Sequence, residues 1–251
     1  MSGSRADPLD AVEEGPVPLP SSSSGTGRPD CSLTALHEAS HCIVGRYFGL
    51  PIAAVTVVAS EHFFGRCLGP ASNPDDSPEM LLAAAEAICT QALAARPLPG
   101  EDALEFAGPW FAHVASRMTE LVAGFAGERL GGYSASGEGG SSDIAIAKVF
   151  AGTIAAPSAV PAYLDFCRRS AEAILRDHWP AVLSLAAELD ARGTLDGADI
   201  DRIIEAAEFK VAREAELARR KKMAEMIASA ENFLARTIGN SHETSNAPLK
   251  R

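Results

Sequence analysis

The chain has 251 residues, of which 47% are hydrophobic, and it carries a formal net charge of −11. That length and composition are sufficient for one domain with a substantial core. The acidic balance argues against nucleic acids and anionic membranes as partners, because both are bound through basic patches. The sequence has no uninterrupted apolar run of about 18 residues, so we expect no membrane span.

The cysteines and the start of the chain indicate a compartment. The five cysteines are dispersed and form no CxxC pair, a pattern typical of free thiols in a reducing environment. The first residues lack the basic and then apolar pattern of a secretory signal. We therefore expect a cytoplasmic protein.

The first third of the chain alternates between tail, helix and strand patterns. Residues 1–29 are rich in Pro, Ser and Gly and predict a disordered tail. Helical periodicity follows, with Asp30 or Ser32 as the cap, and ends near Gly49. The β-branched run at 51–60 predicts a strand, and the residues after it predict a second strand or an extended rim before a loop at 69–78.

The rest of the chain predicts helices, apart from a turn and cap over residues 191–200. These helices are expected over residues 79–95, 109–132, 142–155, 158–177, 179–191 and 198–237, with a disordered tail at 239–251. The predicted fold class is therefore α+β and predominantly α-helical, with a small β-sheet followed by a helical bundle.

The most informative motif is His-Glu-Ala-Ser-His at residues 37–41. On a helix, His37 and His41 lie one turn apart on the same face, so both imidazoles can bind one metal ion. Glu38 follows the first ligand and can act as a base on a metal-bound water. Because the helix also has an apolar face, buried polar residues there need a reason such as a metal site. A third ligand is still required.

Several separated stretches, in order, resemble the peptidase domain of FtsH-type zinc metalloproteases. They are TALHEASHCIVGRYFG, PIAAVTVVAS, FGRCLG, LVAGFAGERLGG, GEGGSSDIAIAKVFA and HWPAVLSLAAELDARGTLDGADIDRII. The resemblance implies a zincin-like fold around the HExxH helix and a peptidase domain over residues 30–205. It also implies an insertion at about 70–108 and a C-terminal helical extension at 206–238.

The resemblance also implies the missing ligand. It places Asp143 at the position of the acidic residue that completes the zinc site in this family, and a carboxylate is a normal zinc ligand. Alternatively, Asp143 is a helix-start residue favoured by the helix dipole, and Glu138 is another candidate ligand. Glu128 matches an acidic position of the family and is either a partner of a ligand histidine or a helix-terminal carboxylate.

The expected activity is that of a zinc-dependent metalloendopeptidase acting on unfolded segments or peptides. Glu38 would be the general base on a zinc-bound water. An extended substrate would pair with the strand edge around Val57, Phe64, Gly65 and Arg66. FtsH proteases carry an ATPase module and membrane helices, whereas this chain has no GxxxxGK[ST] loop. We therefore expect a stand-alone peptidase domain, with any unfolding done by a separate ATPase.

A non-catalytic alternative also fits the sequence. The family usually has Gly where Ser40 stands, and the rim is only loosely similar, so the chain could be a degenerate relative that binds partners or forms homo-oligomers. The last predicted helix carries an apolar stripe that either packs on its own domain or contacts another chain. That stripe consists of Met223, Met226, Ile227, Ala230, Phe233 and Leu234.

Overall fold

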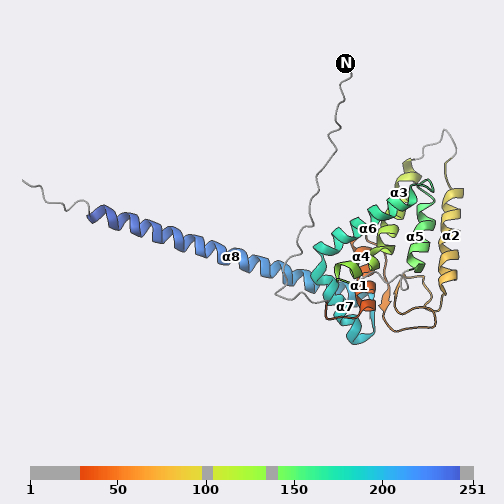
Figure 1. Ribbon diagram of the computed structural model, residues 1–251, viewed down its shortest axis with the longest axis horizontal. Coiled ribbons are helices and arrows are strands. Elements are labelled where there is room, and N and C mark those ends of the chain that lie inside the picture. The colour runs from red at the N-terminus through yellow and green to blue at the C-terminus, as the bar shows by residue number, and fades with distance from the viewer. Residues whose placement is uncertain (1–28, 98–103, 134–140, 244–251) are drawn as a thin grey trace, which may run out of the picture.

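The computed structural model describes residues 29–97, 104–133 and 141–243. It has the predicted α+β class, with helices predominating over one small sheet (Figure 1). Its elements are α1 (Leu33–Tyr47), β1 (Ala54–Thr56), β2 (Arg66–Leu68), α2 (Pro78–Ala94), α3 (Leu104–Leu121), α4 (Ala123–Leu130), α5 (Ser141–Ala151), α6 (Val160–Asp177), α7 (Trp179–Arg192), β3 (Thr194–Asp196) and α8 (Gly197–Glu243). The predicted N-terminal tail, apart from Pro29, lies outside the described residues.

Helix α1 is the centre of the fold. Its N-cap is Ser32, whose side chain accepts a hydrogen bond from the amide of Ala35 at 3.1 Å. Every residue from Ala35 to Gly45 is buried, including the polar residues of the motif. Helices α3, α4, α6 and α7 all contact α1, so it is enclosed on several sides.

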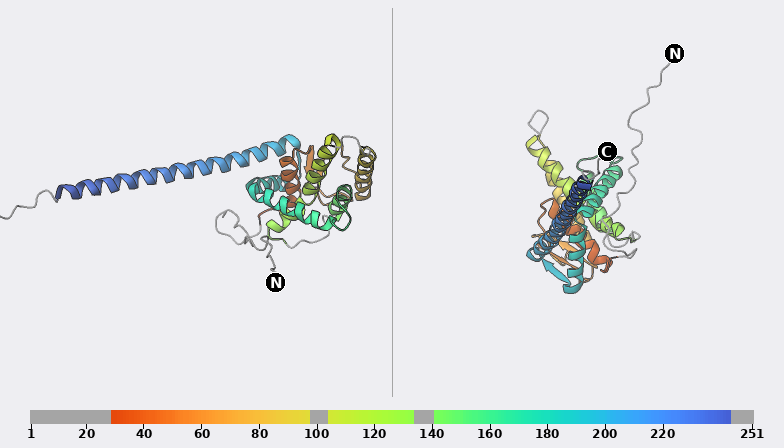
Figure 2. Two further views of the ribbon diagram at one scale, coloured as in Figure 1. Left: turned by 90° about the horizontal axis from the view of Figure 1, so that it is seen from above. Right: turned by 90° about the vertical axis from the view of Figure 1, so that its left-hand side faces the viewer.

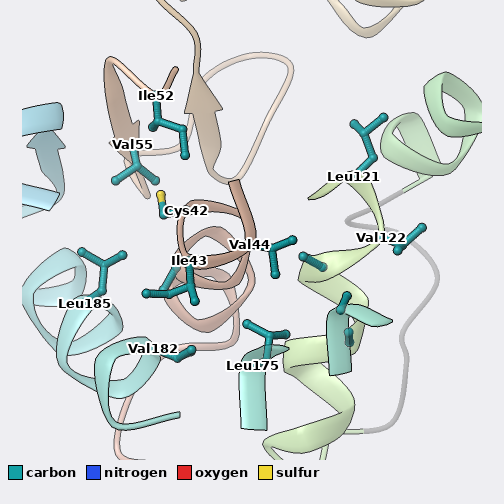
Figure 3. Packing of buried hydrophobic residues seen from close by; sticks show 14 of the residues in the cluster. Cys42, Ile43, Val44, Ile52, Val55, Leu121, Val122, Leu175, Val182 and Leu185 are labelled. Carbon is teal, nitrogen blue, oxygen red and sulfur yellow. The ribbon is translucent and has the colours of Figure 1, made fainter. Parts of the chain in front are cut away.

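The core around α1 is built from aliphatic side chains of several elements. Figure 3 shows Ile43 and Val44 of α1 facing Leu175, Val182 and Leu185 of the later helices, with Ile52 and Val55 on the opposite side. Cys42 is fully buried among them. All five cysteines are free, as predicted.

The sheet is antiparallel, in the order β2-β1-β3. Val55 pairs with Cys67 on one side and with Leu195 on the other. The sequence did not predict β3, because its residues were expected to form a turn and a helix cap. The strand has only three residues and follows Gly193, whose φ is +75°, so it is too short to show a periodic pattern. Strand β1 is therefore central, and β2 lies at an edge.

The single helix predicted over 109–132 is in fact two helices. Residue Val122, with φ −92° and ψ −1°, separates α3 from α4. Pro109 lies inside α3. In helices, Pro is more commonly found at the first helical position. Phe111, near the start of α3, is 50% exposed. Both helices contact α1, and a pattern of apolar residues alone does not reveal the break between them.

Helix α8 projects far beyond the rest of the molecule (Figures 1 and 2). It continues to Glu243, so residues 239–243 are helical and not part of a tail; the remaining residues of that tail, 244–251, lie outside the description. Gly239 does not end the helix, because one weak helix former costs only about 1 kcal/mol in a cooperative helix. The predicted apolar stripe does not pack on its own domain, because Met223, Met226 and Ile227 are exposed.

No helix among the described residues combines the length and apolar character needed to span a bilayer. This agrees with the expectation from the sequence for those residues. The long helix α8, in particular, alternates charged and apolar residues along its exposed part.

Two glycines let α4 approach α1 closely. A Cβ atom at Gly127 would lie 1.9 Å from Oγ of Ser40, and one at Gly124 would lie 2.3 Å from the ring of His37. The Ser40 hydroxyl instead donates a hydrogen bond to the carbonyl oxygen of Leu36 at 2.7 Å. The serine in the motif is therefore accommodated by the absence of a side chain opposite it.

We predict that Gly127→Ala lowers the free energy of unfolding by about 1–3 kcal/mol, because the added methyl group overpacks this contact. Ser40→Gly in the same chain removes the obstruction and restores most of the loss. Urea denaturation measures both. Gly108→Ala is the matched control, since a Cβ there meets nothing within 4 Å. Equal stability of the Gly127→Ala and Gly108→Ala variants would contradict the prediction.

Candidate metal centre

The three predicted ligands lie together. The Nε2 atoms of His37 and His41, one turn apart on α1, are 3.0 Å from each other. Asp143, in the first turn of α5, places Oδ2 at 3.6 Å from Nε2 of His37 and 3.7 Å from Nε2 of His41. One ligand atom from each residue falls within 4.8 Å of the others. This group could hold a metal ion, and it is formed by residues about a hundred positions apart in the chain.

Hydrogen bonds at Nδ1, the ring nitrogen that does not face Asp143, fix the ring orientation of both histidines. Nδ1 of His37 lies 2.7 Å from Oε1 of Glu128, and Nδ1 of His41 lies 2.8 Å from the carbonyl oxygen of Glu120. These oxygens only accept, so each Nδ1 carries the proton and donates it. Each Nε2 is then left with a lone pair directed at the same point as Asp143. This is the usual arrangement of metal-ligating histidines.

Glu128 therefore has a defined place beside a ligand histidine, which was one of the two alternatives left open by the sequence. Glu120 was missed. Its carboxylate also lies 3.3 Å from Nδ1 of His41 and forms an ion pair with Arg117 at 2.9 Å. Glu120 is buried near the end of α3, and its contact through the main-chain carbonyl leaves no trace in the sequence.

The spacing of the donor atoms fits a tetrahedral zinc ion. Bonds of about 2.0–2.1 Å at tetrahedral angles place neighbouring ligand atoms about 3.3 Å apart. The three separations of 3.0, 3.6 and 3.7 Å lie on both sides of that value. Two imidazoles and one carboxylate also leave a fourth position open, as catalytic zinc sites do.

The electrostatics of the cluster favour a bound cation. Burial lowers the pKa of the His41 imidazole, but the carboxylates of Asp143 and Glu120 outweigh it and leave that pKa well above its usual value. Burial raises the pKa of Asp143, yet the adjacent imidazoles of His37 and His41 bring the pKa below the usual range. The site thus holds an excess of negative charge that a proton or a metal ion can neutralise.

Glu38 is buried beside the ligands. Desolvation raises the pKa of its carboxyl group to about 7, against the opposing effect of His41 and His37. The rim residue Gly65 packs directly on it, since a Cβ at Gly65 would lie 2.9 Å from Cγ of Glu38. A buried carboxyl group with a pKa near neutrality is well suited to accept and return a proton.

A cavity of about 480 Å³ adjoins Glu38 and His37. Its walls come from α1, from the rim before β2, and from the first turns of α2 and α5. The residues that line it include Thr34, His62, Phe64, Gly65, Leu82 and Ala145. The cavity gives an extended or flexible ligand access to the carboxylate and to the ligand histidine.

Of the predicted substrate-edge residues, Phe64 and Gly65 line this cavity, and Phe64 is 75% exposed. Arg66 is buried, and its Nη1 donates to the carbonyl oxygens of the loop at residues 73–76, so its side chain holds that loop. Val57 is not at a free edge, because its amide donates to the carbonyl oxygen of Gly193 at 2.8 Å. The prediction that Val57 lies at a free edge was wrong, because β3, which the sequence did not predict, occupies this side of β1.

The alternative ligand Glu138 lies outside the described residues. In comparisons with known proteins, no family model and no curated protein matches the chain. A function is therefore inferred from the site itself: three convergent donor atoms, a buried carboxylate and an adjoining cavity.

We predict that Glu128→Gln weakens zinc binding by about tenfold or more, because the acceptor that orients His37 loses its charge. Competition with a chromophoric chelator measures the affinity. Glu79→Gln makes the same chemical change at the cavity wall without contacting either histidine, and we expect no change in affinity there. Equal zinc affinities of the two variants would show that Glu128 does not contribute to metal binding.

Proposed function

We propose that the protein is a zinc-dependent metallopeptidase that hydrolyses peptide bonds in unfolded segments or peptides. The observation that carries the proposal is the convergence of Nε2 of His37, Nε2 of His41 and the Asp143 carboxylate beside a buried Glu38. A zinc ion held there would supply a Lewis acid that activates a water molecule and polarises a carbonyl group.

Glu38 is the general base in this proposal. Its carboxylate accepts a proton from the attacking water and then delivers it to the leaving amine, which requires a pKa near neutrality. The buried position of Glu38 favours that pKa, and its contact with Gly65 holds the carboxylate against the rim. His37 and His41 are held in a single tautomer by Glu128 and by the main chain of Glu120, so their metal-binding nitrogens are preorganised.

The substrate class follows from the edge of the sheet and the cavity. Strand β2 is an edge strand, and the rim residues Phe64 and Gly65 that precede it line the cavity next to Glu38. An extended peptide can add to such an edge by main-chain hydrogen bonds. A folded substrate cannot, so we propose unstructured segments, delivered by a separate ATPase where the substrate is folded.

Membership of the FtsH-type peptidase family is part of the proposal. It is supported by the order of the similar stretches along the chain and by the fit of Ser40, the main departure within the motif, opposite Gly127. A cytoplasmic location is proposed on the five free thiols. A non-catalytic binding module is the second candidate, favoured by the exposed face of α8.

The decisive variant is Glu38→Gln. We expect it to bind zinc at about one ion per chain, because Glu38 is not a ligand, and to lose about a hundredfold to ten-thousandfold in kcat/KM. The measurement is hydrolysis of a fluorescently labelled unfolded protein, with zinc content determined in the same samples.

Two controls frame that result. Glu86→Gln, at an exposed position of α2 outside the cavity lining, should leave both activity and zinc content unchanged. Asp143→Ala should lose zinc and activity together. A wild-type protein that contains stoichiometric zinc but hydrolyses neither unfolded protein nor peptide would contradict the peptidase proposal and favour the binding module.

A further inference from the structure

Helix α8 carries a seam of side chains that repeats every seven residues. The seam alternates steps of three and four residues, which is the spacing of a two-stranded coiled coil. Its members are Phe209, Ala212, Glu216, Arg219, Met223, Met226 and Ala230. Phe209, Met223 and Met226 are all at least half exposed. This part of α8 is well over 20 residues long, and such a length of helix in water is normally stabilised by packing.

The seam faces away from the body of the protein. Near its start, α8 buries Ile200, Ile203 and Ala207 against the body. At 100° per residue, the seam is centred roughly 160° around the helix from that buried face. A second helix could therefore lie along the seam from Phe209 onwards without meeting the body, and Figures 1 and 2 show α8 extending clear of it.

Two charged residues interrupt the apolar seam at its middle. Glu216 forms ion pairs with Arg219 at 2.7 Å and with Arg220 at 2.7 Å. Glu216 and Arg219 both occupy seam positions, where a charge is costly unless it meets an opposite charge. A single polar layer of this kind is a known way of fixing the register and orientation of paired helices.

We propose that the occupant of the seam is α8 of a second copy of this chain, running antiparallel. One register places Glu216 against the partner's Arg219 and Arg219 against the partner's Glu216. The same register places the small Ala212 against the partner's Met223, and Phe209 against the partner's Met226. Opposite charges and complementary sizes therefore coincide in one alignment about a two-fold axis.

A parallel pair lacks this complementarity. It would place Glu216 against the partner's Glu216 and Arg219 against the partner's Arg219, with like charges facing at the centre of the seam. Arg220 flanks the layer in both arrangements, where its long side chain can reach solvent while it pairs with Glu216. The antiparallel alignment alone leaves each seam charge paired across the interface.

The first test is the oligomeric state of the full chain by sedimentation equilibrium over a range of concentrations. Wild type should be a dimer, and Glu216→Arg should raise the dissociation constant about a hundredfold or more, because four basic side chains then meet. The exchange of both charges, Glu216→Arg with Arg219→Glu, should restore the dimer. Glu214→Arg is the matched control, since it makes the same charge change on the opposite face of the helix.

The second test is the orientation. In a mixture of Ala212→Cys chains and Met223→Cys chains, a short bis-maleimide should link the two different variants. The Ala212→Cys chains alone should not link to each other, and the parent chain shows any contribution from the native cysteines. Circular dichroism and zinc content of every variant confirm that the body remains folded.

Three results would overturn the proposal. The first is a wild-type chain that stays monomeric at all concentrations, which would leave the seam to a different partner. The second is a dimer that Glu216→Arg weakens no more than Glu214→Arg does. The third is efficient linkage between two Ala212→Cys chains, which would show a parallel pair. None of these results bears on the metal centre, so the peptidase proposal is tested separately.

Discussion

The close packing of α4 on α1 is the contact on which the metal centre depends. Gly124 and Gly127 bring the two helix backbones together, and the ring of His37 occupies the space that a side chain at Gly124 would fill. Only at this separation does Glu128, one residue after Gly127, reach Nδ1 of His37 at 2.7 Å. The orientation of a ligand is thus decided by the absence of two side chains on the neighbouring helix.

The same packing creates an electrostatic problem that a cation resolves. Glu38, Glu120, Glu128 and Asp143 all lie near two imidazoles in a largely buried region. Gathering several carboxylates away from water is costly unless positive charge is supplied. Although burial lowers it, the neighbouring carboxylates hold the pKa of His41 well above its usual value. A divalent ion at the convergence point of the Nε2 atoms would supply that positive charge by accepting the two Nε2 lone pairs in place of protons.

The features of the site that the sequence predicts are those made by residues close together in the chain. The pairing of His37 and His41 was predictable, because helical periodicity fixes side chains four residues apart. Asp143 could be named only through a family resemblance, because nothing local joins α5 to α1. The role of Glu120 could not be read, since its main-chain carbonyl makes the contact. Strand β3 is too short to show a pattern and was not predicted. Val57 was therefore expected at a free edge of the sheet.

The position of α8 could not be predicted from the sequence either. An apolar stripe on a helix can pack on the same domain or on another chain, and its sequence is the same in both cases. Its base nevertheless contacts the helix that bears His37 and His41. Arg46, in the last turn of α1, donates to the carbonyl oxygens of Ile52 and Gly197 and forms an ion pair with Asp201 at 2.7 Å. Gly197 in turn donates to the carbonyl oxygen of Ala53.

These contacts join the end of α1, the sheet and the first turn of α8 into one rigid corner. A residue with a side chain at position 197 would lie 2.8 Å from the carbonyl oxygen of Ile52, so the approach of α8 to β1 requires glycine there. The start of α8 packs on α7 and the sheet, and Arg46 at the end of α1 adds a polar contact to that packing.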